Sequence, residues 1–296
     1  MDRVERGVVR HGVRLMVRDY GGSGSPVVML HGLAGHSGEW DTTAGWLRER
    51  HRVLAFDQRA HGASERRPAD VSRAAYVADV VTIIDELELG EAVLIGQSLG
   101  GHTAMLAAAA RPDLVQALVL VEAGPGNPDA DLPNAIRSWL ASWPVPFGSQ
   151  DAAIEFFGGG PVGSGWAAAL EERQDGWWPR FEPELMVRSV VELSRRSFWP
   201  EWRQVSCPTL VVLAESGFFS ADAAREIARD RPNTTMVTVP GAGHDVHLER
   251  PEAVRAAVAE FLQGLGGNRS GRGVGRNVRS RSGIQSETHT CEKLGQ

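Results

Sequence analysis

The chain has 296 residues, of which 42% are hydrophobic, and carries 31 basic and 37 acidic residues. This length suits one large domain with an insertion or two modest domains, and this apolar content can bury a sizeable core. The one lysine, Lys293, lies near the C-terminus, which excludes chemistry that needs a lysine inside the folded body, such as Walker A phosphate binding or Schiff-base formation.

Short runs rich in Val, Leu and Ile alternate with segments of helical periodicity between residues 8 and 263. This alternation predicts an α/β fold, a mostly parallel central sheet with helices on both faces. An antiparallel pair at 7–11 and 14–20 is expected to start the sheet, and further strands are predicted at 27–31, 52–57, 92–96, 117–122, 209–214 and 235–240. Two of the predicted helices are 72–88, with an N-cap serine, and 251–263, with a proline in its first turn.

Two segments break this alternation. Residues 124–205 have no clear strand and hold seven of the nine tryptophans, which predicts a mostly helical cap inserted into a core formed by 1–123 and 206–263. Residues 264–296 are rich in Gly, Ser and Arg without periodicity and predict a disordered tail. This tail holds six basic and two acidic residues, so the body is acidic, with 25 basic and 35 acidic residues. An acidic body argues against a nucleic-acid enzyme, and such a tail is more typical of a solvated segment.

A G-x-S-x-G pattern, Gly96 to Gly100, lies between a predicted buried strand and an Ala-rich helix. In this context the pattern predicts a sharp strand-to-helix turn that exposes Ser98 at the carboxyl edge of the sheet. Ser98 would also lie at the N-terminus of the helix, where unpaired N–H groups favour developing negative charge. These features indicate Ser98 as a nucleophile.

Three further motifs complete a resemblance to the α/β-hydrolase fold superfamily that covers nearly all of residues 8–263. The His-Gly-x-x-Gly loop of the superfamily appears at 31–35, and its loop after the fourth strand appears as DQRAHGAS at 57–64, with Ala60 where glycine is more usual. Its late histidine appears as His244 in PGAGHDVHLERPE. The resemblance implies a serine hydrolase with a helical cap.

The resemblance also implies roles for particular residues. His244 would take the proton of Ser98 as the serine attacks a carbonyl carbon. The main-chain N–H groups of Leu33 and Leu99 would hold the oxyanion that forms. The expected reaction is therefore acyl transfer to Ser98, followed by hydrolysis of the acyl-enzyme.

The acid that orients His244 is the uncertain member of the triad. Relatives usually carry it as Gly-x-x-Asp after the strand at 209–214, where this sequence has Ala214 and Gly217. Some members place it at the end of the preceding strand, which here ends in Glu122. We therefore rank Glu122 first, and the alternatives are Glu215, Asp222 and Asp57.

Aromatic side chains near these motifs predict a substrate pocket. Trp40 follows the oxyanion loop, Trp139 and Trp143 follow Glu122, and Phe218 lies in the loop after the strand at 209–214. This lining suits a small apolar or aromatic substrate. The alternative for the tryptophans of the insertion is that they pack the cap against the core.

A serine nucleophile favours cleavage of an ester, lactone, thioester or amide bond. The alternatives are carbon–carbon bond hydrolysis of diketones, a haloperoxidase-type reaction without cofactor, and a non-catalytic ligand-binding module on the same fold. No cofactor is required, and no metal is expected because the pair His244 and His247 has no third ligand at zinc spacing.

The expected partner is a small-molecule substrate, with neither nucleic acid nor membrane, and the sequence leaves the oligomeric state open. No apolar stretch has the length of a signal peptide or a membrane span, and Cys207 and Cys291 form no disulfide framework. We therefore expect a cytoplasmic location. The arginine bias is typical of a GC-rich bacterial genome.

Overall fold

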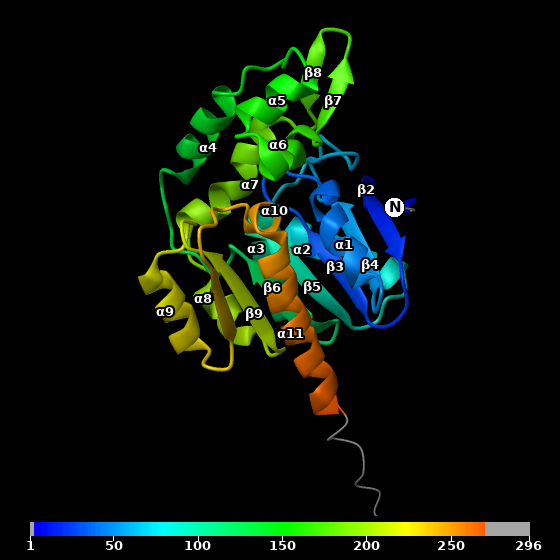
Figure 1. Ribbon diagram of the computed structural model, residues 1–296, viewed down its shortest axis with the longest axis vertical. Helices are drawn as coiled ribbons and strands as arrows, with labels where there is room; N and C mark the ends of the chain where they lie inside the picture. The colour runs from blue at the N-terminus through cyan, green and yellow to red at the C-terminus, as the bar shows by residue number, and fades with distance from the viewer. Residues whose placement is uncertain (1–2, 270–296) are drawn as a thin grey trace, which may run out of the picture.

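An eight-stranded sheet crosses the structure, a computed structural model that describes residues 3–269 (Figure 1). The strand order is β1-β2-β4-β3-β5-β6-β9-β10, in which β2 pairs antiparallel with β1 and β4 and all other neighbours are parallel. Every strand of this sheet lies where the sequence predicts one, which confirms the α/β fold class. The strands are β1 (Val4–Arg10), β2 (Val13–Gly21), β3 (Pro26–Leu30), β4 (Arg52–Asp57), β5 (Ala92–Gln97), β6 (Val115–Val121), β9 (Thr209–Ala214) and β10 (Thr235–Val239).

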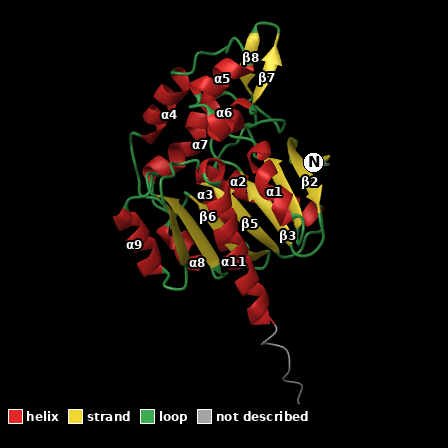
Figure 2. Ribbon diagram, viewed as in Figure 1, coloured by secondary structure: helices red, strands yellow, loops and turns green. Residues whose placement is uncertain are grey.

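Helices cover both faces of this sheet (Figure 2). One face packs against α1 (Asp41–Leu47) and α11 (Pro251–Arg269), next to the short helices η1 (Ser37–Trp40) and α10 (Val246–Glu249). The other face packs against α2 (Arg73–Glu86), α3 (Ser98–Ala110), α8 (Trp199–Gln204) and α9 (Ala221–Asp230). No helix among residues 3–269 is both long enough and apolar enough to cross a bilayer.

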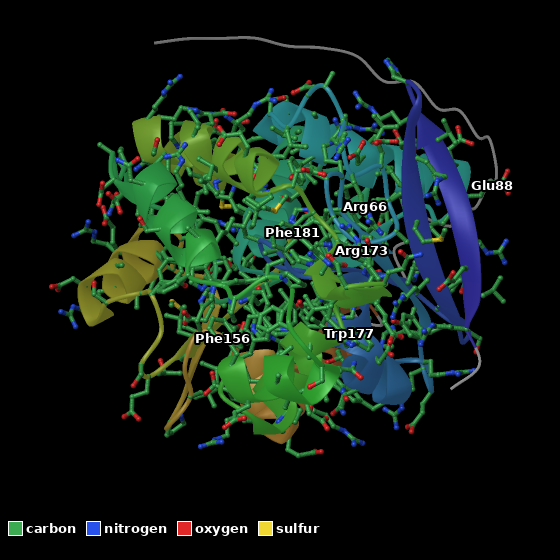
Figure 3. All side chains as sticks on the ribbon, turned by 90° about the horizontal axis from the view of Figure 1, so that it is seen from above. Arg66, Glu88, Phe156, Arg173, Trp177 and Phe181 are labelled. Carbon is green, nitrogen blue, oxygen red and sulfur yellow. The ribbon has the colours of Figure 1, made fainter. Side chains whose placement is uncertain are left out.

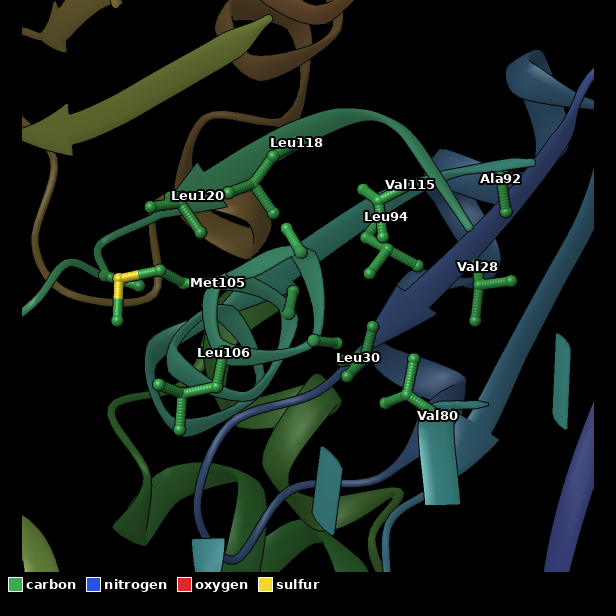
Figure 4. Packing of buried hydrophobic residues seen from close by; sticks show 14 of the residues in the cluster. Val28, Leu30, Val80, Ala92, Leu94, Met105, Leu106, Val115, Leu118 and Leu120 are labelled. Atoms are coloured by element: carbon green, nitrogen blue, oxygen red, sulfur yellow. The ribbon is translucent and has the colours of Figure 1, made fainter. Parts of the chain in front are cut away.

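The core is divided into two clusters because successive side chains of a strand point to opposite faces. On β3, Val28 and Leu30 join the cluster under α2 and α3, which also contains Val80 of α2 and Met105 of α3 (Figure 4). Val27 and Met29 join the cluster under α1 and α11. Both faces are apolar, which is why the central strands have continuous hydrophobic runs.

The cap lies above the carboxyl edge of the sheet and contains one element that the sequence does not predict (Figure 1). It consists of α4 (Leu132–Ala141), α5 (Gln150–Phe156), α6 (Gly160–Ala167), α7 (Pro183–Arg195) and an unexpected antiparallel hairpin, β7 (Leu170–Arg173) with β8 (Gly176–Pro179). The hairpin is held at its base by Glu171, whose carboxylate pairs with Arg66 of the core and with Arg173. Figure 3 labels Arg66 and Arg173, which lie near one another where the hairpin meets the core. The bond between the Gly62 N–H and the Arg180 carbonyl, 2.9 Å, joins the same two parts.

Two expected boundaries differ from those in the structure. Trp202 of α8 is fully buried against α3, so the chain rejoins the core before residue 205, the expected end of the insertion. The tail was expected to start at residue 264, but α11 continues to Arg269. Leu262 and Leu265, three residues apart on one helix face, pack against the core and support the extra turn. The remainder of the predicted tail, 270–296, lies outside the described residues.

Candidate active site

The chain turns sharply from β5 into α3 at Ser98, whose φ of 50° lies in the left-handed region. Only glycine fits on both sides of this turn. A β-carbon on Gly96 would lie 2.5 Å from the backbone of Gly100, and one on Gly100 would lie 2.5 Å from the carbonyl oxygen of Leu30. A non-glycine residue held in this conformation costs about 1–3 kcal/mol, and such strain is concentrated at functional sites. Ser98 lies at the N-terminus of α3, as the motif predicts, and its side chain is half-buried.

Two buried histidines hold the loop after β3 that carries Leu33. The Nε2 atom of His31 accepts the Gln58 N–H at 2.9 Å, and Gln58 Nε2 donates to the His31 carbonyl at 2.6 Å. The Nε2 atom of His61 accepts the Ala34 N–H at 3.1 Å. Burial lowers the pKa of His61 to about 3, so its ring is neutral and able to accept. The loop is therefore fixed by side chains from the neighbouring loop after β4.

The loop, the turn and His244 meet at one point of the sheet edge. A β-carbon on Gly32 would lie 3.4 Å from Cβ of Ser98, so the loop passes directly beside the serine. Gln97 Nε2 donates to the His244 carbonyl at 3.2 Å, which ties the histidine loop to the residue before Ser98. Residues from β3, β5 and β10 meet here because the carboxyl ends of parallel strands share one edge.

Glu122 directly follows β6, and its carboxylate contacts the His244 ring at Nδ1. Its side chain is fully buried, and its φ of 49° repeats the left-handed conformation of Ser98. One carboxylate oxygen accepts the Ala214 N–H at 2.7 Å. The other accepts the Phe218 N–H at 2.9 Å and lies 3.3 Å from Nδ1 of His244. Both oxygens of the buried carboxylate therefore have hydrogen-bond donors.

Gly217 explains how the carboxylate fits between β6 and the loop after β9. A β-carbon at this position would overlap the Glu122 carboxylate, so an aspartate at 217 and Glu122 exclude each other sterically. Glycine at 217 and glutamate at 122 therefore form a complementary pair.

The structure does not bring the other candidate acids to His244. Glu215 is exposed and accepts the Gly241 N–H at 2.8 Å. Asp222 is exposed and pairs with Arg225. Asp57 is buried below the loops, where its oxygens accept the N–H groups of Ser37 and Ala63, each at 2.7 Å. Burial alone would raise the pKa of Asp57, but His31 and these hydrogen bonds outweigh it and hold the pKa at about 2.

The four residues expected to line a pocket occupy different environments. Phe218 is 79% exposed, and its ring lies over His244 with the centroids 3.9 Å apart. Trp139 and Trp143 pack edge to face in the cap, where Trp143 is buried and Trp139 is partly exposed. Trp40 is fully buried in the core cluster under α1 and α11. The structure therefore places Trp40 in the core, because η1 turns its ring toward the sheet.

Sequence reasoning missed the contacts that join the cap to the His244 loop. Trp166 of α6 donates from Nε1 to Asp245 Oδ2 at 2.9 Å. The preceding residue, Gly165, has its carbonyl 3.3 Å from Nε2 of His36, in the loop after β3. Asp245 is adjacent to His244, so the cap is bonded directly beside the base. The only signals in the sequence were an aspartate after the histidine and one tryptophan among seven in the insertion.

The fold and this arrangement of side chains define the α/β-hydrolase class. A family model described as alpha/beta hydrolase fold matches residues 25–251, and the chain belongs to this family. It is 29% identical over 259 residues to a 2-(acetamidomethylene)succinate hydrolase of Mesorhizobium japonicum, covering 84% of this chain and 92% of that one. It is 31% identical over 247 residues to the sn-1-specific diacylglycerol lipase ABHD11 of Mus musculus, covering 80% of each chain.

Solved structures are similar over most of the chain. The crystal structure of E-2-(acetamidomethylene)succinate hydrolase matches with a TM-score of 0.81 at 27% identity, covering 88% of this chain and all of that one. A marine microorganism esterase matches with a TM-score of 0.71 at 27% identity, covering 84% and 99%. These relatives are hydrolases that differ in substrate, so the family alone leaves the substrate open.

Proposed function

We propose that the protein is a serine hydrolase that cleaves an ester, lactone or thioester bond of a small apolar or aromatic substrate. Ser98 is the nucleophile, His244 the general base and acid, and Glu122 the acid that orients His244. The N–H groups of Leu33 and Leu99 form the oxyanion hole. The observation that carries the proposal is the contact between Glu122 and Nδ1 of His244, at the same sheet edge as the half-buried Ser98.

The proposed reaction proceeds in two halves. Ser98 Oγ attacks the carbonyl carbon while Nε2 of His244 takes its proton, and the oxyanion is held by two N–H groups. Each such donor contributes about 100- to 1000-fold in rate. The C–O or C–S bond then breaks, and the leaving group takes the proton from His244. Water then loses a proton to His244 and attacks the acyl carbon, the bond from this carbon to Ser98 Oγ breaks, and Oγ takes the proton back from His244 as the acid leaves.

The apolar character of the surroundings supports the substrate class. Leu33 packs against the cap cluster that contains Trp143 and Phe181, and Phe218 covers one face of His244. An apolar acyl or alcohol group is stabilised against such surfaces by about 25 cal/mol per Å² of apolar area removed from water. We therefore favour butyryl and aromatic esters over dicarboxylic substrates. A cytoplasmic location, no cofactor and no nucleic-acid or membrane partner remain predictions of the sequence.

The test combines active-site labelling with a substrate screen. A fluorophosphonate probe should label the wild-type protein and the Ser216→Ala variant, which loses an exposed serine near the site, but not Ser98→Ala. The screen compares p-nitrophenyl esters of increasing acyl length, lactones, thioesters and a succinate half-ester, with Ser98→Ala as the blank. A folded wild-type protein that neither reacts with the probe nor hydrolyses any substrate would contradict the proposal and favour a ligand-binding module.

A further inference from the structure

A buried arginine lies behind the nucleophile turn. Arg73 begins α2 and is 1% exposed. Its Nη2 donates to the Leu99 carbonyl at 3.3 Å and to the hydroxyl of Thr103, both on the first turns of α3. The guanidinium also lies over the ring of Tyr76, 4.7 Å from the centroid. A positive charge is thus placed beneath the residue whose N–H is a proposed oxyanion donor.

This arginine is a poor choice for stability alone. Among the described residues, its Nε and Nη1 atoms are buried without a hydrogen-bond partner. Burial lowers the pKa of Arg73 to about 10, so the group remains charged at neutral pH. A buried cation without a paired carboxylate is generally less stable than an apolar side chain of similar volume. Its presence in the core therefore calls for a role other than packing.

Hydrogen bonds connect Arg73 to both halves of the proposed oxyanion hole. Thr103 Oγ1 accepts from Arg73, and its single O–H is shared, in a three-centre bond, between the Leu99 carbonyl at 2.9 Å and Oε1 of Gln58 at 3.2 Å. The amide nitrogen of Gln58 donates to the His31 carbonyl at 2.6 Å, and the Gln58 N–H donates to the His31 ring at 2.9 Å. His31 is two residues before Leu33. One chain of bonds thus spans from α2 through α3 to the loop after β3.

We propose that Arg73 is a positioning residue for the oxyanion hole. Arg73 holds the first turn of α3 directly, and it holds the loop that carries Leu33 through Thr103 and Gln58. It thereby sets the distance between the N–H groups of Leu33 and Leu99. An N–H group stabilises the oxyanion when its nitrogen lies about 2.7–3.1 Å from the oxyanion oxygen. A small shift of either N–H group therefore removes much of its contribution to the rate. The inference rests on the proposed function, because it assumes that these N–H groups hold the oxyanion.

The first test replaces Arg73 by methionine, which is of similar length and apolar. We expect kcat on the best ester of the screen to fall about 10-fold or more, with KM changed less than about twofold. We expect the thermal midpoint to stay equal or rise, because an unpaired buried charge is removed. The affinity for butylboronic acid, whose adduct on Ser98 places an oxygen in the hole, should fall by the same factor as kcat/KM.

A second pair of variants keeps the charge and changes only the connection. Thr103→Val removes the hydroxyl between Arg73 and Gln58 and should lower kcat, and Thr103→Ser, which keeps it, should restore kcat. The matched control is Thr82→Val on α2, since the Thr82 hydroxyl bonds the carbonyl four residues earlier at 2.8 Å, as that of Thr103 does. This control should leave kcat unchanged.

The outcomes separate the inference from the proposed function. If wild-type protein hydrolyses no substrate and does not react with the fluorophosphonate, the proposed function fails. If the wild type is active and Arg73→Met retains its kcat, or loses kcat only in proportion to lost folded protein while its boronate affinity is unchanged, the inference is wrong. If Arg73→Met does not fold, the Thr103 pair decides: equal kcat in the valine and serine variants overturns the inference.

Discussion

Replacing Glu122 by glutamine tests the proposed acid with the smallest change in shape. The two carboxylate oxygens accept from Ala214, Phe218 and His244. A glutamine has one acceptor oxygen and one NH₂ group. In either orientation of the amide, the NH₂ group faces a main-chain N–H, of Ala214 or of Phe218. One buried donor is therefore left without an acceptor.

The expected loss of rate follows from the geometry. A unit negative charge 3.3 Å from Nδ1 stabilises the imidazolium of His244 by up to about 5 kcal/mol at an effective dielectric constant of about 20. Losing it corresponds to as much as about 10⁴-fold in kcat/KM. If the NH₂ group faces His244 instead, the ring takes the tautomer that cannot accept the Ser98 proton, with a loss of about 10⁴-fold. The unpaired donor also costs about 1–3 kcal/mol of stability.

The assay measures kcat/KM on the best ester and the free energy of unfolding in urea. Glu215→Gln is the matched control, because its carboxylate also accepts a main-chain N–H but is exposed. We expect Glu122→Gln to lose at least about 100-fold and Glu215→Gln less than about twofold. Gly217→Ala should also lose activity, because its β-carbon overlaps the carboxylate. Full activity of Glu122→Gln together with an inactive Glu215→Gln would refute the assignment.

Two further predictions concern the cap and acid stability. Trp166→Phe removes the 2.9 Å bond to Asp245 and should lower the unfolding free energy by about 1 kcal/mol and raise KM. The control Trp178→Phe loses a similar bond within the hairpin and should leave KM unchanged. Equal KM values in both variants would contradict a role for the Trp166 contact in substrate binding. Burial lowers the pKa of His61 to about 3 and that of His102 well below 6.5. As pH falls, both histidines are therefore protonated in the unfolded chain at a higher pH than in the folded protein. Stability should therefore be complete above about pH 6.5 and fall by up to about 1.4 kcal/mol per pH unit for each histidine as pH drops toward the folded pKa. The check is the free energy of unfolding in urea, measured between pH 7.5 and 4.5. His102→Leu should reduce the slope of this free energy against pH by the amount that corresponds to one proton taken up on unfolding. A wild-type free energy that does not change with pH would contradict the prediction.

The parts of the protein that depend on near neighbours in the chain are predictable from the sequence. The run at 92–97 forms β5, and glycines on both sides of Ser98 permit the turn into α3, because each requirement involves only a few adjacent residues. The same holds for the strands, for the N-cap of α2 by Ser72 and for the start of α11 at Pro251. Weak local signals are where prediction failed, as at the short strands β7 and β8.

Contacts between distant loops were decided only by the tertiary structure. Glu122 and His244 are 122 residues apart, and whether one of several carboxylates reaches the ring depends on how the loops after β6, β9 and β10 pack. The burial of Trp40 likewise depends on where η1 lies against the sheet. The buried position of Arg73 follows from the packing of α2 on α3. The residue types at these places are visible in the chain, but distance, burial and shared donors arise only when separate segments fold together.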